Sequence, residues 1–390
     1  MNYRTDDNLS ILGFGCMRFP KKGSSFDYDE IEHELMYAID NGVNYFDMAY
    51  IYPGIEEAFG TVMEKCGFRD RINIATKLPH YMMNTVDEMQ KYFDEQLKRL
   101  KTDHVDYYLM HMLPDLKTWK DLVDKGAPEW LEGLKEKGKI RKIGFSFHGN
   151  TNLFLELLNA YSWDFCQVQY NYIDETSQAG RRGVEEAHAK GIPVIIMEPL
   201  KGGRLVNNLP KEVYKIFESS PRSYSPAEWG LRWLWDQPGI SVILSGMNSM
   251  DQVKENIRIA SEVTVSSMTE EDHKVIDKAR EVINKKTKVP CTGCAYCMPC
   301  PFGVDIPGSF HCLNTSYNDS YAVGIREYLM CTAFKKQSSN ASLCRECGRC
   351  EQHCPQHIEI RRELKAVKRR FENPIYKLIV FGYNKVLKRG

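Results

Sequence analysis

The chain has 390 residues, of which 43% are hydrophobic and 27% charged, and its 52 Lys and Arg residues balance 52 Asp and Glu residues. This composition is that of a globular protein with room for one large and one small domain, and it excludes a disordered or fibrous chain. The zero net charge provides no overall positive field, so nucleic acid is not expected as a partner. No signal peptide or apolar stretch long enough to span a membrane is evident, so we expect a cytoplasmic protein for which membrane binding is disfavoured.

From residue 10 to about 250, short apolar runs alternate with longer stretches of helical periodicity, which is the pattern of a parallel β/α fold. Asp27 opens one amphipathic stretch that stops at Asn41-Gly42, and Thr269 opens the last one, which ends around 285–288. Eight strand-helix units over about 250 residues predict a (β/α)8 TIM barrel. The candidate strands are Leu12 to Met17, Val43 to Met48, Ile72 to Lys77, Val105 to His111, Lys142 to Ser146, Phe165 to Tyr170, Pro193 to Glu198 and Ser241 to Gly246.

Ten of the 13 cysteines follow residue 290, and eight of these form two tight runs. The second run has the bacterial ferredoxin spacing for [4Fe-4S] clusters and ends in Pro, and the first run is one residue shorter before its fourth Cys. We therefore predict a barrel domain over 1–285, followed over 286–390 by a small, α-rich, ferredoxin-like domain with two [4Fe-4S] clusters. Zinc is the alternative for CxxC pairs, but four Cys in each run exceed what zinc requires. The predicted ligands are Cys291, Cys294, Cys297, Cys300, Cys344, Cys347, Cys350 and Cys354.

The fourth Cys of each run is expected to ligate the other cluster, as in two-cluster ferredoxins. Cys354 would then join the first three cysteines of the first run, and Cys300 the first three of the second run. The two runs are separated by 43 residues, and we expect helices to fill this interval.

Polar residues stand at the carboxyl ends of three predicted strands, where barrel enzymes place their catalytic groups. They are Asp47, Lys77 and His111, with Tyr52 just beyond the strand that Asp47 ends. The segment 42–52, with Gly-Val-Asn-Tyr-Phe-Asp followed by Ala and Tyr, resembles the signature of the aldo-keto reductases. The four residues also fall in that family's order, within a resemblance that covers about 10–260.

This resemblance implies an NAD(P)-dependent oxidoreductase that interconverts a carbonyl and an alcohol by hydride transfer. Tyr52 would donate the proton as general acid, and Lys77 would stabilise its ionised form. Asp47 would hold Lys77 by ion pairing, while His111 would orient the carbonyl oxygen by hydrogen bonding.

The same resemblance implies a dinucleotide site, although Met197 stands where many family members stack a Tyr on the nicotinamide and Phe147 where many have Asn. No Lys or Arg for a 2′-phosphate is apparent after the eighth strand, so NADP and NAD both stay open. Arg204 or Arg258 is an alternative ligand for the 2′-phosphate, but we interpret both as solvated surface residues. The implied cofactor-binding residues are Gly15, Cys16, Met17, Asp47, Ser146, Gln167, Met197, Pro199, Leu200, Gly246, Met247, Gln252 and Asn256.

Three hypotheses for the combined chain stay open at this point. In the first, the barrel acts on a small-molecule carbonyl or alcohol and the clusters link it to a ferredoxin or flavodoxin-like electron carrier. Because a dinucleotide gives two electrons as hydride and each cluster accepts one, a mediator such as a flavin could serve, although no sequence feature requires it. In the second hypothesis the clusters are structural or redox-sensing. In the third the barrel is idle and the protein is an electron-transfer adaptor.

Overall fold

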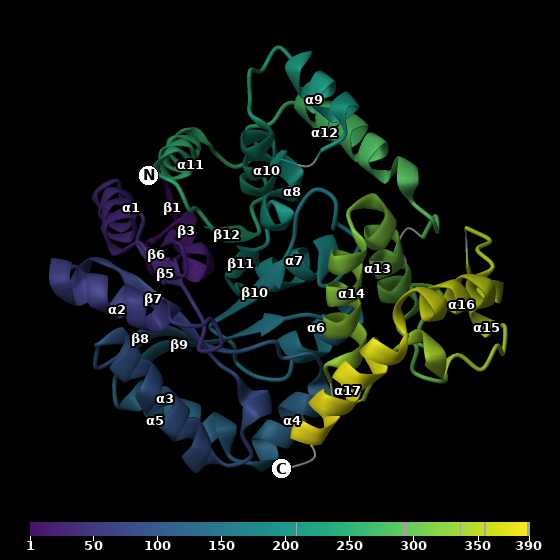
Figure 1. Ribbon diagram of the computed structural model, residues 1–390, viewed down its shortest axis with the longest axis horizontal. Coiled ribbons are helices and arrows are strands. Elements are labelled where there is room, and N and C mark those ends of the chain that lie inside the picture. Colours follow the sequence, from purple (N-terminus) through teal and green to yellow (C-terminus); the bar gives the residue numbers. More distant parts are fainter. Residues whose placement is uncertain (208, 292, 294, 336, 355, 388–390) are drawn as a thin grey trace.

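The computed structural model describes residues 1–207, 209–291, 293, 295–335, 337–354 and 356–387, and its largest element is a closed parallel barrel (Figure 1). All eight predicted strands are confirmed, with ends that differ from the expected ones by at most two residues. They follow one another around the barrel in chain order, as expected for parallel strands that are joined by helices. The strands are β3 (Leu12–Gly15), β6 (Tyr45–Asp47), β7 (Asn73–Leu78), β8 (Val105–Met110), β9 (Ile140–Phe147), β10 (Phe165–Gln169), β11 (Val194–Met197) and β12 (Ile240–Ser245).

Helices surround the barrel, and their ends follow local capping chemistry. Asp27 caps α1 by accepting a hydrogen bond from Glu30, and Thr269 forms a capping box with Asp272 at the start of α12, as the sequence indicated. The helices of this part are α1 (Tyr28–Asp40), α2 (Ile55–Cys66), α3 (Val86–Leu100), α4 (Leu116–Asp124), α5 (Ala127–Glu136), α6 (Thr151–Leu158), α7 (Gly180–Ala189), α8 (Arg204–Asn207), α9 (Lys211–Glu218), α10 (Pro226–Trp235), α11 (Met250–Glu262) and α12 (Glu270–Ile283).

Short elements complete this part of the chain. The hairpin strands are β1 (Tyr3–Arg4) with β2 (Leu9–Ser10), and β4 (Lys21–Lys22) with β5 (Ser25–Phe26). The 3-10 turns are η1 (Cys16–Arg18), η2 (Arg69–Arg71), η3 (His80–Met82), η4 (Lys201–Gly203) and η5 (Asn284–Lys286).

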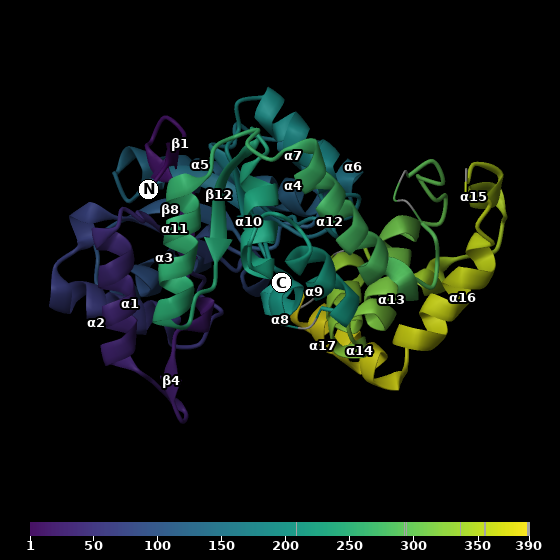
Figure 2. The same cartoon turned by 90° about the horizontal axis from the view of Figure 1, so that it is seen from above.

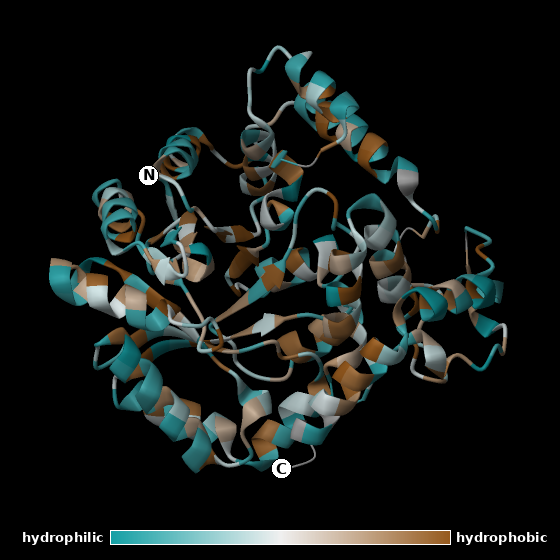
Figure 3. Cartoon of the chain, viewed as in Figure 1, coloured by the Kyte–Doolittle hydropathy of each residue, from teal (hydrophilic) through white to brown (hydrophobic). Residues whose placement is uncertain are grey.

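Two hydrophobic layers hold the barrel together. One fills its interior with side chains such as Tyr45, Tyr107 and Phe165, and the other lies between the strands and the helices. Hydrophobic residues gather on the strands and on the inner faces of the helices, as Figure 3 shows. The interior is thus a packed core and not a pore, and the carboxyl ends of the strands are where barrel enzymes place their active sites.

The C-terminal part forms helices around a second, separate core that includes Val304, Phe310 and Phe371. Its helices are α13 (Ile306–Asn318), α14 (Tyr321–Tyr328), α15 (Arg349–Gln352), α16 (Ile360–Phe371) and α17 (Pro374–Leu387), with the π-helical turn η6 (Leu329–Ala333) and the 3-10 turn η7 (Ala341–Leu343). Helices α13 and α14 fill the interval between the cysteine runs, as expected. The boundary at 285/286 stays a prediction.

The C-terminal part packs against one side of the barrel (Figure 2). Helix α17 contacts η3, and the ring of Tyr383 lies 4.6 Å from that of Phe334. Several apolar side chains of α17 nevertheless face solvent, among them Leu378 and Phe381. Within the described residues, none of the helices combines the length and apolar character needed to cross a membrane.

Candidate active site and cysteine centres

The four predicted catalytic residues lie together at the carboxyl ends of adjacent strands. Asp47 ends β6, Lys77 lies in β7 and His111 directly follows β8, while Tyr52 lies in the loop before α2. The Lys77 ammonium donates hydrogen bonds of 2.7 Å to both carboxylate oxygens of Asp47 and to the Met48 carbonyl. The centroid of the Tyr52 ring lies 5.8 Å from Lys77 Nζ and 6.2 Å from the centroid of the His111 ring.

The surroundings of Tyr52 favour its protonated form. Burial, followed by the carboxylates of Asp47 and Glu198, raises the pKa of Tyr52 above its ordinary value. This direction differs from the expectation that Lys77 would stabilise the phenolate. The Lys77 charge is offset by Asp47 at 2.7 Å, so desolvation of the phenol dominates. Near neutral pH, the Tyr52 phenol therefore keeps its proton.

His111 is held as a neutral imidazole. Burial is the main cause that lowers its pKa well below the ordinary value, and the charges of Lys77, His148 and His80 act in the same direction. Its Nδ1 atom is buried and has no hydrogen-bond partner within the described part of the chain. A neutral imidazole donates one N–H, which suits the orientation of a carbonyl oxygen.

Ser146 and Gln167 lie side by side on the paired strands β9 and β10. The Ser146 hydroxyl accepts a hydrogen bond of 2.8 Å from the Met112 amide, and the Gln167 amide group lies 3.7 Å from the Met197 sulfur. The Oε1 atom of Gln167 is buried, and no described residue donates to it. An unpaired buried oxygen is costly, so this site fits a ligand with an N–H donor, as the nicotinamide carboxamide has. Phe147, fully buried, supplies no hydrogen bond there.

The loops after β3 and β11 supply further predicted contacts. Gly15 ends β3, and η1 follows with Cys16, which is buried, and Met17, which is 59% exposed. Pro199 and Leu200 follow β11, where Pro199 is buried and Leu200 half-buried. Because β3 and β11 both neighbour β12, these loops border the same end of the barrel.

Arg18 is a residue that the sequence interpretation did not assign to the site. A Cβ on Gly202 would stand 2.8 Å from an Arg18 guanidinium nitrogen, and one on Gly246 would stand 3.1 Å from its Cδ. The Arg18 side chain thus lies across the loops after β11 and β12, where larger residues would displace it. It is exposed and forms no hydrogen bond or ion pair with any other residue that the structure describes. The sequence feature that could have assigned Arg18 to the site is its position next to Met17 in the loop after the first strand.

The segment after β12 places the remaining predicted contacts. Gly246 is exposed and Met247 buried. The exposed Gln252 accepts a hydrogen bond from the amide of Asn248, and the buried Asn256 donates one of 2.8 Å to the hydroxyl of Ser245, which ends β12. Asn256 therefore fixes the strand end, while Gln252 shapes the loop at the surface.

The two arginines weighed as phosphate ligands are paired with carboxylates. Arg258 binds Glu228 at 2.6 Å and Glu262 at 3.0 Å, and Arg204 lies 3.5 Å from Asp319. The Arg258 side chain is 48% exposed, as expected for a surface residue, whereas that of Arg204 is 27% exposed and therefore partly buried.

The cysteine runs come together on the second core. Cys291, Cys297 and Cys354 line one small cavity together with Ile306 and Phe310. The last cysteine of the second run thus lies with members of the first run, which is the arrangement that crossed ligation needs. Cys294 lies outside the described residues. The other predicted ligands are Cys300, Cys344 and Cys350, which pack against the same core, and Cys347, which is exposed.

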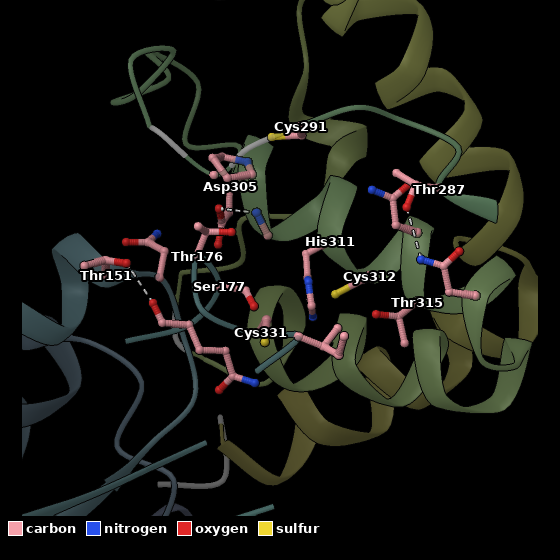
Figure 4. Close-up of a pocket in the computed structure, with 18 of the residues that line it drawn as sticks. Thr151, Thr176, Ser177, Thr287, Cys291, Asp305, His311, Cys312, Thr315 and Cys331 are labelled. Atoms are coloured by element: carbon pink, nitrogen blue, oxygen red, sulfur yellow. Dashed lines mark hydrogen bonds between the residues drawn. The ribbon is translucent and has the colours of Figure 1, made fainter. Parts of the chain in front are cut away.

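A second, larger cavity of about 510 Å³ lies between the barrel and the C-terminal domain. Figure 4 shows Ser177, in the loop after β10, and Thr151, the first residue of α6, on the barrel side of this cavity, with His311 of α13 on the other side and Cys291 near the edge. The Thr151 hydroxyl donates to the Gln178 carbonyl at 2.9 Å in this wall. The first cysteine run therefore borders a space that it shares with the barrel.

Comparisons with known proteins agree with this division. Residues 11–281 match the Aldo/keto reductase family, and residues 290–359 match the 4Fe-4S dicluster domain. The chain is 24% identical over 306 residues to L-galactose dehydrogenase of Arabidopsis thaliana, covering 72% of this chain and 93% of that protein. It is 26% identical over 305 residues to the uncharacterized oxidoreductase YqkF of Bacillus subtilis, covering 70% and 93%.

Solved structures show the same fold. The holo form of aldo-keto reductase AKR11C1 from Bacillus halodurans has a TM-score of 0.59 at 25% identity, covering 72% of this chain and 95% of that one. An aldo-keto reductase from Klebsiella pneumoniae in complex with NADPH also has a TM-score of 0.59, at 22% identity, covering 71% and 94%. With the matched barrel, the dicluster match and relatives named as dehydrogenases and oxidoreductases, the chain belongs to the aldo/keto reductase family of oxidoreductases and carries a C-terminal 4Fe-4S dicluster domain.

Proposed function

We propose that this protein reduces a small-molecule carbonyl compound to an alcohol at the Tyr52 site. The observation that carries the proposal is the buried Lys77–Asp47 ion pair beside Tyr52, with both ion-pair side chains less than 10% exposed. A bound nicotinamide dinucleotide, NADPH or NADH, supplies the hydride to the carbonyl carbon. The phenol of Tyr52 gives its proton to the carbonyl oxygen, and the neutral imidazole of His111 orients that oxygen.

The residues around the Tyr52 site prepare this proton transfer. Asp47 fixes the Lys77 ammonium, which in turn donates to the Met48 carbonyl in the loop that leads to Tyr52. Lys77 would stabilise the phenolate that remains after the transfer, although its charge does not ionise Tyr52 beforehand. We further infer that Ser146 and the unpaired oxygen of Gln167 hold the nicotinamide carboxamide.

The test compares Tyr52→Phe with Tyr50→Phe in the complete, cluster-loaded protein. Tyr50 lies two residues away, and its hydroxyl donates instead to Glu95. Loss of the general acid should lower the rate of carbonyl reduction about 10²- to 10⁴-fold, while dinucleotide binding measured by fluorescence is unchanged. Tyr50→Phe should keep its activity. Retained turnover in Tyr52→Phe would overturn the proposal.

We also propose that the C-terminal domain holds two [4Fe-4S] clusters and exchanges electrons with an acidic carrier of the ferredoxin or flavodoxin kind. When bound, each cluster gives or takes one electron. The surface around Cys347 supports this proposal. Cys347 is exposed, and so are Arg345 and Arg349, which lie two residues before and after it. Positive side chains beside an exposed cluster ligand favour docking of a negatively charged protein.

The carrier proposal is tested by mixing the dithionite-reduced protein with oxidised ferredoxin under anaerobic conditions. Arg345→Glu and Arg349→Glu should each slow the reoxidation of the clusters at low salt, and the effect should fade at high salt. Lys137→Glu, on an exposed residue after α5 in the barrel, is the matched control. Equal rates in all four proteins would instead assign the clusters a structural or sensing role.

A further inference from the structure

A chamber of about 610 Å³ lies between the mouth of the barrel and the C-terminal helices. The barrel contributes Ile51, Tyr81 and Met112 to its wall, and most of the remaining wall comes from α14, η6 and α17. Figure 1 shows α14 and α17 crossing this side of the barrel, and the Tyr328 and Tyr376 rings of these two helices lie 5.7 Å apart. The chamber thus belongs to both domains, and its size is within the range of small-molecule sites, about 300–1,000 Å³.

The chamber adjoins the catalytic tetrad. Ile51 directly precedes Tyr52, and Met112 directly follows His111. The centroid of the Tyr81 ring lies 6.4 Å from that of His111. A compound held in the chamber would therefore lie against the residues that adjoin Tyr52 and His111 in the chain.

The chamber wall is apolar and rich in rings. Tyr81, Phe334 and Tyr383 present aromatic faces or edges, and Met112 and Met330 add thioethers, which adapt to flat ring systems.

The chamber wall also carries a guanidinium, that of Arg326, but this group binds Glu198 at 3.2 Å. The side-chain amide of Asn373 likewise donates to the Tyr321 hydroxyl at 3.1 Å. The two groups thus have partners within the protein, and most of the other lining side chains are hydrophobic or aromatic, so a neutral ligand with few polar atoms suits the chamber best.

We propose that the cluster-bearing domain supplies the apolar half of the substrate site and selects neutral aromatic aldehydes or ketones. This inference rests on the proposed function of the Tyr52 site. In each turnover the carbonyl carbon takes the hydride of NAD(P)H, the oxygen takes the Tyr52 proton, and the phenolate regains a proton from solvent, which yields the alcohol and NAD(P)+. A sugar would place its hydroxyl groups against a wall whose side chains are mostly apolar or aromatic, which disfavours a substrate like that of L-galactose dehydrogenase.

The test uses substitutions along α17 in the complete, cluster-loaded protein. Ile375 and Ile379 line the chamber and are 69% and 41% exposed. Leu378 and Phe381 are on the same helix and are 70% and 65% exposed, but they are not part of the chamber wall. Ile375→Asn and Ile379→Asn should lower the ratio of kcat/KM for 2-naphthaldehyde to kcat/KM for glyceraldehyde about tenfold, because an apolar contact is lost. Leu378→Asn and Phe381→Asn should keep that ratio. A ratio unchanged in all four variants, or lowered equally, would overturn the inference.

A binding measurement separates the chamber from the chemistry. The product 2-naphthylmethanol is fluorescent, and its affinity for the protein can be measured without turnover. If the Tyr52 site proves inactive but Ile379→Asn weakens this binding and Leu378→Asn does not, the chamber is supported while the proposed reduction fails. If carbonyl reduction proceeds and 2-naphthylmethanol does not bind, or binds all variants equally, the chamber is overturned and the proposed reduction stands.

Discussion

Lys201 of the barrel and Glu327 of α14 face each other across the domain junction, with the ammonium 3.6 Å from a carboxylate oxygen and both side chains buried. Asp174 lies 3.0 Å from the same ammonium, and His311 lies 3.3 Å from Glu327 and 3.6 Å from Asp174. These four side chains form one charged network between the domains. Each of these charges is compensated by a partner on the other domain. We therefore expect the network to stabilise the docking of the C-terminal domain on the barrel.

Removal of Lys201 should destabilise the junction strongly. In Lys201→Met the carboxylates of Asp174 and Glu327 stay buried without their main counter-charge, which costs about 3–5 kcal/mol for a buried pair. Urea unfolding followed by circular dichroism measures the free energy of unfolding. Lys211→Met, on an exposed residue, is the control and should change it by less than about 0.5 kcal/mol. A similar free energy of unfolding for Lys201→Met and Lys211→Met would show that the network does not stabilise the junction.

The same network predicts a pH dependence of stability. Burial opposes the charged form of His311, but its hydrogen bond to Glu327 and the charge of Asp174 raise its pKa above the ordinary value. Burial likewise opposes the charged form of Glu327, yet Lys201 and His311 lower its pKa. The His311 contribution is complete below about pH 6.5 and is lost as the pH rises through the raised pKa. The Glu327 contribution is complete above about pH 4.5 and is lost as the pH falls.

The junction should therefore be most stable between about pH 4.5 and 6.5. The free energy of unfolding of the wild type minus that of His311→Gln should shrink between pH 6 and pH 9. His273→Gln, which removes a half-exposed imidazole beside Asp236, provides a comparison away from the junction. A difference for His311→Gln that stays constant with pH would exclude protonated His311 from the network.

The barrel could be predicted from the sequence because the features that specify each strand and helix lie within short stretches of the chain. The strands are short, mostly apolar runs, with polar residues such as Asp47 and His111 at or just beyond the ends of some of them, and parallel strands joined by helices have few arrangements. The order of Asp47, Lys77 and His111 along the chain therefore became their order around the barrel. The proximity of the four catalytic side chains followed from this topology.

Contacts between distant segments could not be predicted in the same way. Arg326 and Glu198 are 128 residues apart, and their ion pair arises only when α14 docks on the barrel. The apolar residues of α17 do not by themselves show which surface this helix covers. The position of Arg18 is of the same kind, because its neighbours Gly202 and Gly246 lie far from it in the sequence.

Arg18 is expected to hold the dinucleotide through its pyrophosphate. Its side chain crosses the loops after β11 and β12, which both carry predicted cofactor contacts, and a guanidinium binds phosphate oxygens with two N–H groups. Arg18→Gln should weaken the binding of NADPH and of NADH to a similar extent, about tenfold, which corresponds to about 1.4 kcal/mol of binding free energy. Lys22→Gln, whose exposed ammonium pairs with Asp27, is the control. A loss confined to NADPH would place Arg18 at the 2′-phosphate instead.

Crossed ligation of the clusters predicts which cysteine variants share a defect. The complete protein should contain about eight iron atoms, and loss of one cluster should leave about four. Because Cys297 and Cys354 line one cavity, the double variant Cys297→Ala, Cys354→Ala should keep as much iron as either single variant. The pair Cys344→Ala, Cys354→Ala should lose both clusters. Iron analysis and EPR after anaerobic purification provide the measurement, with Cys331→Ala, a buried cysteine outside both runs, as the control. If Cys344 and Cys354 instead behave as members of one cluster, each run binds its own cluster and the crossed arrangement is wrong.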